Sequence, residues 1–397
     1  MPRSGNPLSA SNCVVTPIFH NVAFFFEDTE QFVNYKTDKR NRGRYGRYDN
    51  PNWSEVEDRL ATLEDSEAAL LFPSGMSALT STVLTFVRQG EKILFLSRTY
   101  RNAKALFDEV ISGFGIKAVA LDQADTDLFK EQFLKEYDTK CRMVVIEMPS
   151  NPHQYLVDLA FVRQTVGPDT LILVDSTLST PINLKPLRHG ADLVVHSCTK
   201  YLAGHADVMA GSVAGTVARL EKLRRTRDVT GAIPGPDTAF LLNRGLETLP
   251  MRMANFESVG ATVAKYLNGH PRVSRVYWTG LPDHPHHELA KKYLLGHGGV
   301  IAFELCASRI ETTVFVDKLR VPYMGTNFGS CQPMVEQCSV FTYYKLAPQE
   351  RESMGITDQL VRLSVGFASA EILIEDMEQA FAQTFRRPDR RVSNAWG

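Results

Sequence analysis

The sequence has few cysteines, almost no net charge and no long apolar run. Its six cysteines among 397 residues lack a Cys-x-x-Cys pair or a repeated spacing, which argues against a disulfide framework and a zinc site. The 44 Lys and Arg residues balance 45 Asp and Glu residues, so the whole chain is not drawn electrostatically to nucleic acid or an anionic membrane. No run of about 18 apolar residues occurs and the N-terminus is polar. We therefore expect a cytoplasmic protein that does not span a membrane.

The pattern of apolar residues predicts an α/β fold. Helical spacing of apolar residues begins after Trp53, and short apolar runs then alternate with amphipathic segments, which is typical of a parallel sheet. The runs are 69–72, 92–96, 118–121, 143–146, 170–174 and 193–196. Ligands of such sheets gather at the carboxyl ends of the strands, so the polar residues there are the first candidates for chemistry.

Three regions follow from the same pattern. Residues 1–52 have a basic stretch over 39–47 without helical or strand periodicity, and we expect an extended arm. Residues 53–245 form the large α/β domain. Residues 246–397 form a smaller α+β domain, with strands at 300–304 and 361–365 and a last helix over 373–381.

The most informative segment surrounds Lys200. A buried strand leads into Ser197, Thr199 and Lys200. A lysine amine among apolar neighbours loses its proton more readily and can form a Schiff base, although a lysine at a strand end can also be a surface residue. Asp175 closes another strand, where a carboxylate can hold a pyridine nitrogen protonated or simply cap a turn. Together they predict a site for pyridoxal 5′-phosphate (PLP).

A second segment predicts a place for the phosphate of that cofactor. Ser74 and Gly75 stand at the start of a predicted helix, where free N–H groups and the helix dipole favour an anion. The hydroxyls of Ser197 and Thr199 can add donors to the same phosphate. Ser-Gly before a helix is also an ordinary N-cap, so the prediction depends on the combination of segments.

Four segments in this order resemble the Cys/Met-metabolism family of fold type I PLP-dependent enzymes, and the match extends over about 16–381. They are 73–76 (Pro-Ser-Gly-Met), 147–152 (Glu-Met-Pro-Ser-Asn-Pro), 174–181 (Val-Asp-Ser-Thr-Leu-Ser-Thr-Pro) and 196–205 (His-Ser-Cys-Thr-Lys-Tyr-Leu-Ala-Gly-His). The resemblance implies a transferase fold with a large, mostly parallel, mixed sheet of the seven-stranded type. A smaller C-terminal α+β domain and the N-terminal arm complete this expected fold.

The resemblance also implies roles for individual residues. Lys200 is the expected Schiff-base lysine and proton shuttle, Asp175 the partner of the pyridine nitrogen, and Tyr100 the ring that stacks on the cofactor and assists catalysis. The expected remaining cofactor-binding residues are Ser74, Gly75, Met76, Asn151, Thr177, Ser197 and Thr199. The expected substrate-binding residues are Arg362, which grips the α-carboxylate, together with Asn151, Asn327 and Tyr100.

Two further segments allow alternatives. The basic arm resembles an RNA-binding segment with interleaved aromatic residues, but Tyr45 and Arg47 also match a family motif that reaches the cofactor phosphate of a neighbouring subunit. On that interpretation Tyr45 also assists catalysis, and the protein is a homo-oligomer, at least a dimer with shared active sites and expected to be a tetramer. The histidines at 284, 286 and 287 suggest metal ligands, but their family counterpart is structural and we expect no metal.

Within the family, several stretches look most like plant-type cystathionine γ-synthase. They are 44–51, 100–101, 327–332, 342–344 and 354–362. We therefore expect γ-replacement on an O-activated L-homoserine, through a vinylglycine-type intermediate, with cysteine or another nucleophile. The departures from the family pattern include Asp49, Arg98, Asn327 and Gln332. Because most of them fall near the expected substrate, they suggest a changed substrate or nucleophile, as in specialised members of secondary metabolism.

Two other functions stay open. A β- or γ-lyase of the cystathionine or methionine type would use the same cofactor residues but release ammonia and a 2-oxo acid. A binding protein that has lost catalysis and uses the arm for nucleic acid is the third hypothesis. The joint presence of Lys200, Asp175, Tyr100 and Arg362 argues against it. We therefore expect small-molecule partners, with neither nucleic acid nor membrane among them.

Overall fold

The computed structural model describes residues 13–37 and 45–385, and it divides into two compact units. Unit 1 comprises Met1–Pro149 and Val157–Pro250, and unit 2 comprises Ser150–Leu156 and Met251–Gly397. The boundaries expected after residues 52 and 245 stay predictions. Residues 39–44 of the basic stretch lie outside the described residues.

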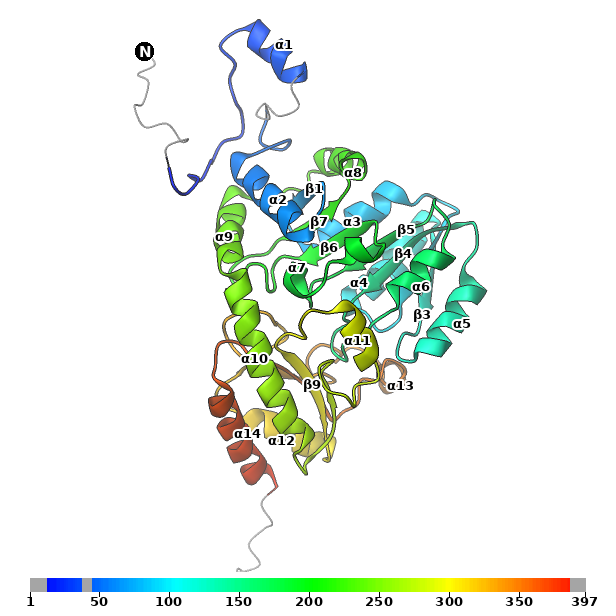
Figure 1. The fold of residues 1–397 in the computed structure, drawn as a ribbon, viewed down its shortest axis with the longest axis vertical. Coiled ribbons are helices and arrows are strands. Elements are labelled where there is room, and N and C mark those ends of the chain that lie inside the picture. The colour runs from blue at the N-terminus through cyan, green and yellow to red at the C-terminus, as the bar shows by residue number, and fades with distance from the viewer. Residues whose placement is uncertain (1–12, 38–44, 386–397) are drawn as a thin grey trace, which may run out of the picture. The chain divides into compact units, whose positions relative to one another are not determined.

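Unit 1 is built on a seven-stranded sheet with the order β1-β7-β6-β5-β4-β2-β3 (Figure 1). Strand β7 runs antiparallel to β1 and β6, and the other neighbours pair in parallel. The strands are β1 (Ala68–Phe72), β2 (Lys92–Leu96), β3 (Lys117–Leu121), β4 (Cys141–Glu147), β5 (Leu171–Asp175), β6 (Leu193–Ser197) and β7 (Gly211–Gly215). All six strands expected from the apolar runs are present, which confirms the α/β class.

Helices cover both faces of this sheet (Figure 1). Both faces are apolar because successive buried strand residues such as Leu70 and Leu71 point to opposite sides. The helical elements are α1 (Thr29–Thr37), α2 (Pro51–Glu64), α3 (Gly75–Phe86), α4 (Arg101–Ala105), α5 (Thr126–Glu136), α6 (Leu159–Thr165), α7 (Thr180–Asn183), α8 (Val217–Thr230) and α9 (Pro236–Glu247), with a π turn η2 (Leu106–Val110) and 3₁₀ turns η3 (Ile111–Phe114) and η4 (Pro186–His189).

The N-terminal arm contains structure that the sequence did not predict. Helix α1 interrupts it. Two asparagines at the start of α2, Asn50 and Asn52, hold residues 17–19. Asn52 accepts a 2.9 Å hydrogen bond from the Phe19 N–H and donates one of 2.9 Å to the Pro17 carbonyl, while Asn50 donates to the Phe19 carbonyl at 2.8 Å. Asp49, a departure from the family pattern, accepts from the Asn50 N–H and the Ser54 hydroxyl. Asp49 therefore stabilises the start of α2 through these two hydrogen bonds.

Unit 2 contains a five-stranded sheet with the order β10-β11-β12-β9-β8. Its strands are β8 (Val273–Tyr277), β9 (Val300–Leu305), β10 (Tyr323–Met324), β11 (Met334–Gln337) and β12 (Leu360–Ser364), and its helices are α10 (Leu249–Asn268, of which the first two residues belong to unit 1), α11 (His287–Tyr293), α12 (Arg309–Lys318), α13 (Pro348–Ser353) and α14 (Ala370–Thr384). Aromatic contacts join Phe315 of α12 to Phe303 of β9 and to Phe381 of α14. Within the described ranges, no helix combines the length and the apolarity needed to cross a bilayer.

Candidate functional site

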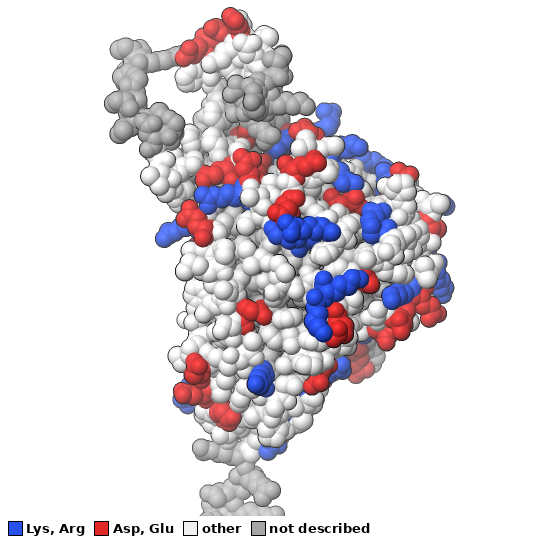
Figure 2. Space-filling model, in the orientation of Figure 1, with Lys and Arg blue, Asp and Glu red and all other residues white. Residues whose placement is uncertain are grey.

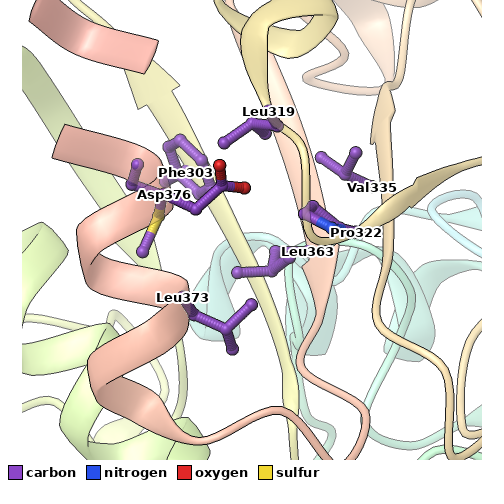
Figure 3. A pocket seen from close by; sticks show the side chains of 8 residues that line it. Phe303, Leu319, Pro322, Val335, Leu363, Leu373 and Asp376 are labelled. Carbon is purple, nitrogen blue, oxygen red and sulfur yellow. The ribbon is translucent and has the colours of Figure 1, made fainter. Parts of the chain in front are cut away.

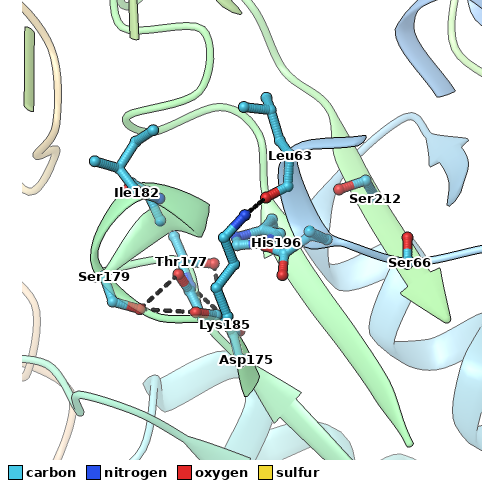
Figure 4. A network of polar contacts seen from close by, with 12 residues as sticks. Leu63, Ser66, Asp175, Thr177, Ser179, Ile182, Lys185, His196 and Ser212 are labelled. Atoms are coloured by element: carbon cyan, nitrogen blue, oxygen red, sulfur yellow. Dashed lines mark hydrogen bonds and ion pairs between the residues drawn. The ribbon is translucent and has the colours of Figure 1, made fainter. Parts of the chain in front are cut away.

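Three of the expected cofactor residues form one hydrogen-bonded group at the ends of β5 and β6. The Thr177 hydroxyl donates to Asp175 Oδ1 at 2.5 Å and accepts from the Ser197 N–H at 2.8 Å, and the Thr177 N–H adds a 3.0 Å bond to the same Oδ1 (Figure 4). The parallel pairing of β5 with β6 brings these strand ends together. A side-chain hydroxyl thus fixes one carboxylate oxygen relative to the next strand.

The Asp175 carboxylate lies in a low-dielectric setting. Burial raises its pKa, and the two hydrogen bonds from Thr177 oppose that rise. Both bonds reach Oδ1, and no other residue in the described ranges donates to Oδ2. A buried carboxylate with a free oxygen suits a cationic N–H partner, such as a protonated pyridine nitrogen, which would stabilise its ionised form.

Glycine allows the start of α3 to approach β6 and β7 closely. A Cβ on Gly75 would lie 2.8 Å from the Ser197 Cβ, and a Cβ on Gly211 would lie 2.2 Å from the Ser74 carbonyl oxygen. Ser74 caps α3 by accepting a 3.0 Å bond from the Ser77 N–H. The remaining N–H groups of the first turn and the Ser197 hydroxyl therefore lie at one end of the sheet, where an anion such as a phosphate fits.

Lys200 lies in the turn that follows β6. Its backbone N–H donates to the Ser197 carbonyl at 3.1 Å, and its carbonyl accepts from the Gly204 N–H at 2.8 Å. The Thr199 hydroxyl bridges to the backbone of Ala210, with a 3.2 Å bond to the carbonyl and a 3.1 Å bond from the N–H. This lysine is therefore held in a closed loop at the end of β6, and β6 pairs in parallel with β5, the strand that ends at Asp175.

Tyr100 precedes α4, and its position depends on an acid that the sequence analysis assigned no role. Glu147, the last residue of β4, accepts 2.6 Å hydrogen bonds from the Thr99 hydroxyl and the Tyr100 N–H. Glu147 pairs in register with Asp175, so two carboxylates end neighbouring strands. Its place at the end of an expected strand was the signal that could have identified it.

The departure at Arg98 has a structural explanation. Its guanidinium makes two hydrogen bonds to the Asp122 carboxylate, of 2.9 and 3.1 Å. Gln123 donates to the Arg98 carbonyl at 2.8 Å and accepts from its N–H. Arg98 therefore ties the segment before Tyr100 to the residues that follow β3.

A buried contact between an imidazole and a carboxylate lies next to the Asp175–Thr177–Ser197 group. His196 Nε2 and Glu64 Oε1 are 2.5 Å apart, and both side chains are almost fully inaccessible to solvent. Lys185 donates to the Leu63 carbonyl at the end of the same helix, α2 (Figure 4). These contacts connect the C-terminal end of α2 to β6 and to the segment between α7 and η4.

The two expected residues of the arm contact their own chain. The Tyr45 side chain is 40% exposed, and the Arg47 guanidinium lies over the rings of Tyr45 and Tyr48 at 5.6 and 4.8 Å. Arg47 also donates to the Asp228 carbonyl in α8. Its reach to a neighbouring subunit's phosphate therefore stays a prediction.

Three of the four residues expected to bind the substrate, all but Tyr100, meet within unit 2. Arg362 in β12 is buried, and its Nη1 donates to Asn151 Oδ1 while its Nη2 donates to the Asn327 carbonyl, each at 3.3 Å. The Glu336 carboxylate lies 3.0 Å from Nη2, and the Phe328 ring lies 5.5 Å from the guanidinium carbon. Sequence reasoning missed Glu336, although its alternation with the apolar Val335 indicates a half-buried strand.

The histidines of residues 284–287 make structural contacts within unit 2. His286 Nδ1 accepts from the Leu156 N–H at 2.8 Å, and His284 Nε2 lies 2.9 Å from the His153 carbonyl. Burial lowers the pKa of His284 to about 4, so this ring is neutral at neutral pH. In the part of the chain that the structure describes, no three His, Cys, Asp or Glu side chains converge as a metal site would require.

A small apolar pocket in unit 2 offers no chemistry. It is lined by Phe303, Leu319, Pro322, Val335, Leu363, Leu373, Asp376 and Met377 (Figure 3). Its one carboxylate, Asp376, accepts 2.9 Å bonds from the N–H groups of Arg320 and Val321. The candidate functional residues therefore form two groups, the polar cluster at the strand ends of unit 1 and the Arg362 group within unit 2.

Comparisons with known proteins identify the family to which the chain belongs. The family model for Cys/Met metabolism PLP-dependent enzymes matches residues 3–382. Chloroplastic cystathionine γ-synthase 1 of Arabidopsis thaliana is 37% identical over 372 residues, which are 93% of this chain and 65% of the relative. An L-methionine γ-lyase of Fusobacterium nucleatum subsp. polymorphum is 35% identical, over 91% of this chain and 92% of the relative.

A solved structure shows the same similarity in three dimensions. The cystathionine γ-synthase of Xanthomonas oryzae pv. oryzae, in complex with cystathionine, superposes with a TM-score of 0.87 at 28% identity, covering 96% of this chain and 99% of that one. The expected fold, PLP dependence and family are thereby confirmed. The chain belongs to the Cys/Met metabolism family of PLP-dependent enzymes.

Proposed function

We propose that this enzyme catalyses γ-replacement on an O-activated L-homoserine, joining cysteine or another nucleophile to its γ-carbon. The observation that supports a PLP enzyme most strongly is the Asp175–Thr177–Ser197 group next to the Gly75 contact. It offers a buried carboxylate for a cationic ring nitrogen and, beside it, helix N–H groups for a phosphate. The likeness to γ-synthases at 37% identity favours replacement at the γ-carbon.

The described residues of unit 1 offer the kinds of groups that PLP needs, a buried carboxylate and the N–H groups of a helix start. Asp175 would hold the ring nitrogen, the first turn of α3 with Ser74, Gly75 and Met76 would hold the phosphate together with Ser197 and Thr199, and Tyr100 would cover the ring. When bound, PLP supplies an electron sink that makes the Cα–H of an amino acid acidic. Glycine at 75 allows this turn to lie close to Ser197, because a Cβ there would be only 2.8 Å from the Ser197 Cβ.

Lys200 is the proposed catalytic base. Its amine, held in the loop after β6, would accept the proton from the substrate Cα, pass that proton to the bound cofactor, and as a neutral amine again accept one from Cβ, so that the γ-substituent could leave with its bonding electron pair. Tyr100 and Tyr45 are the proposed assisting groups. Arg362 would bind the α-carboxylate beside Asn151 and Asn327.

The arm supports a proposed oligomer in which Tyr45 and Arg47 serve a neighbouring subunit's site. Apolar side chains of the arm are unusually exposed in the single chain, with Val14, Val22 and Phe25 all more than 60% accessible. Asn50 and Asn52 hold the arm's backbone firmly while these side chains face solvent. A second copy of the chain would bury them.

The second candidate is a lyase that releases ammonia and a 2-oxo acid. The 35% identity to an L-methionine γ-lyase over 91% of the chain favours it specifically. Both candidates use the same cofactor residues, so substrate tests must separate them. By contrast, on the face drawn in Figure 2, acidic and basic side chains are intermixed, which does not favour the nucleic-acid hypothesis.

The test incubates the PLP-loaded protein with O-phospho-, O-acetyl- or O-succinylhomoserine, or with methionine, each with and without cysteine. Products are identified by mass spectrometry. Cystathionine formed from one ester only in the presence of cysteine supports γ-replacement with that nucleophile. Conversion of an ester or of methionine to 2-oxobutyrate at the same rate with and without cysteine, and with no joined product, contradicts replacement by cysteine and supports the lyase.

A further inference from the structure

The guanidinium of Arg362 already has a carboxylate partner inside the protein. Glu336 of β11 pairs in register with Arg362 of β12, and its Oε1 lies 3.0 Å from Nη2. The side chains are only 1% and 3% exposed, so water screens their charges weakly. An incoming substrate carboxylate would therefore be the second anion beside one guanidinium.

The Glu336 carboxylate is held in place from its other side. The Thr342 hydroxyl donates a 2.6 Å hydrogen bond to Oε2, which leaves Oε1 toward Arg362. The remaining contacts of the guanidinium in the described residues are neutral: Asn151 Oδ1, the Asn327 carbonyl and the Phe328 ring. Glu336 is thus the one acid within ion-pair distance of Arg362 among the described residues, and it cancels the positive charge there.

We propose that Glu336 is a specificity-determining residue that sets how strongly Arg362 binds the α-carboxylate of the amino-acid substrate. This inference rests on the proposed role of Arg362. The fixed negative charge reduces the attraction of the pocket for a carboxylate, so the enzyme binds its amino acid loosely and discriminates weakly between a carboxylate and a neutral carboxamide. Removal of that charge increases both the affinity and the discrimination.

The experiment measures binding of L-norvaline and L-norvalinamide to the PLP-loaded protein by isothermal titration calorimetry. These probes differ in the charge of the group that Arg362 would meet. In Glu336→Gln, which keeps the shape of the side chain, the Kd of norvaline should fall about tenfold while that of norvalinamide stays within about twofold. Glu304→Gln is the matched control, because it removes a charge from the neighbouring strand β9, where Glu304 accepts from Tyr277.

A second variant protects the test against misfolding of the first. Thr342→Val keeps the charge of Glu336 but removes its second hydrogen bond, so the carboxylate pairs more strongly with Arg362. The Kd of norvaline should then rise about threefold, the opposite direction. A purely structural role of Glu336 would lower the melting temperature without changing the ratio of the two dissociation constants.

The outcomes separate this inference from the proposed function. If the loaded wild-type protein binds norvaline but the norvaline-to-norvalinamide ratio is the same in wild type and Glu336→Gln, or in Thr342→Val where Glu336→Gln does not fold, the inference is overturned. If the wild-type protein binds no PLP, the proposed function itself is wrong. The inference is supported if the ratio of the norvaline Kd to the norvalinamide Kd falls in Glu336→Gln, rises in Thr342→Val and is unchanged in Glu304→Gln.

Discussion

The backbone N–H of Tyr100 donates a 2.6 Å hydrogen bond to the carboxylate of Glu147, 47 residues later in the chain. The same carboxylate oxygen accepts from the Thr99 hydroxyl. A charged acceptor strengthens both bonds, so the segment that presents the Tyr100 ring is fixed to the end of β4. Glu147 is therefore a positioning residue for Tyr100.

Glu147→Gln should weaken PLP binding about tenfold, because the loss of the charge weakens the two bonds that orient Tyr100. The measurement is the Kd of PLP, from titration of the cofactor-free protein. Glu131→Gln, on the exposed side of α5, is the control and should leave the Kd unchanged. Equal PLP affinity in wild type and Glu147→Gln would contradict this positioning role.

Much of the sheet could be predicted from the sequence, because runs such as 143–146 and 171–174 are apolar on both faces and short. The strand β7 was missed because Gly211, Ser212 and Gly215 give it neither apolar length nor alternation. Its glycines are needed for close packing against Ser74 and Leu193, a requirement that only the assembled fold reveals. Helix α1 was missed for a related reason, since its apolar positions are few and one of them, Val33, is exposed.

Some residues of the candidate site could likewise be predicted from the sequence, and others could not. Lys200, Asp175 and Ser74 follow predicted strands directly, so the rule that ligands gather at strand ends located them. Glu147 and Glu336 act through contacts distant in the sequence, to Tyr100 and Arg362; the local pattern can mark each as a strand residue, but it does not reveal which residue each one contacts. The departure at Arg98 looked like a change in the substrate pocket, but its ion pair with Asp122 gives it a structural role.

Gly75→Ala should reduce PLP affinity by about tenfold or more. The new methyl group would lie 2.8 to 2.9 Å from the Cβ and Cα of Ser197, so the start of α3 must move away from β6. Titration of the cofactor-free variant with PLP measures this loss. Gly113→Ala, whose Cβ meets no atom within 4 Å, serves as the control. If Gly75→Ala binds PLP as tightly as the control, the start of α3 does not bind the cofactor phosphate.

Glu57→Gln should lower the free energy of unfolding by about 3–5 kcal/mol at neutral pH, because it leaves the guanidinium of Arg227 buried without its anion. Urea unfolding measures the difference. Burial alone would raise the pKa of Glu57, but Arg227 and Arg224 outweigh that effect, and the folded pKa lies below its ordinary value of 4.5.

The pH dependence of this difference follows from the lowered pKa of Glu57. A lowered pKa stabilises the fold fully above pH 4.5, and this stabilisation disappears as the pH falls through the folded pKa. The gap between wild type and Glu57→Gln should therefore be constant near neutral pH and shrink in acid. Glu221→Gln, exposed on α8, should show no gap. A gap that widens in acid would refute the assignment to this ion pair.

Asn52→Ala should release the arm. It removes two 2.9 Å hydrogen bonds to the backbone of Phe19 and Pro17, and we expect proteolysis within residues 13–37 to become about five- to tenfold faster. Limited proteolysis followed by mass spectrometry measures the rate. Asn21→Ala loses only a local bond to Ala23 and is the control. Equal rates of proteolysis in Asn52→Ala and Asn21→Ala would show that the hydrogen bonds of Asn52 do not hold the arm.

Lys200 is the proposed site of covalent attachment of the cofactor, beside the hydrogen-bonded group that contains Asp175 and Ser197. The most direct measurement treats the PLP-loaded protein with borohydride, which fixes the cofactor to its lysine, and locates the label by peptide mass spectrometry. We predict one label on Lys200, with none retained in Lys200→Ala. A label on another lysine, or the same labelling in Lys200→Ala, would contradict the account.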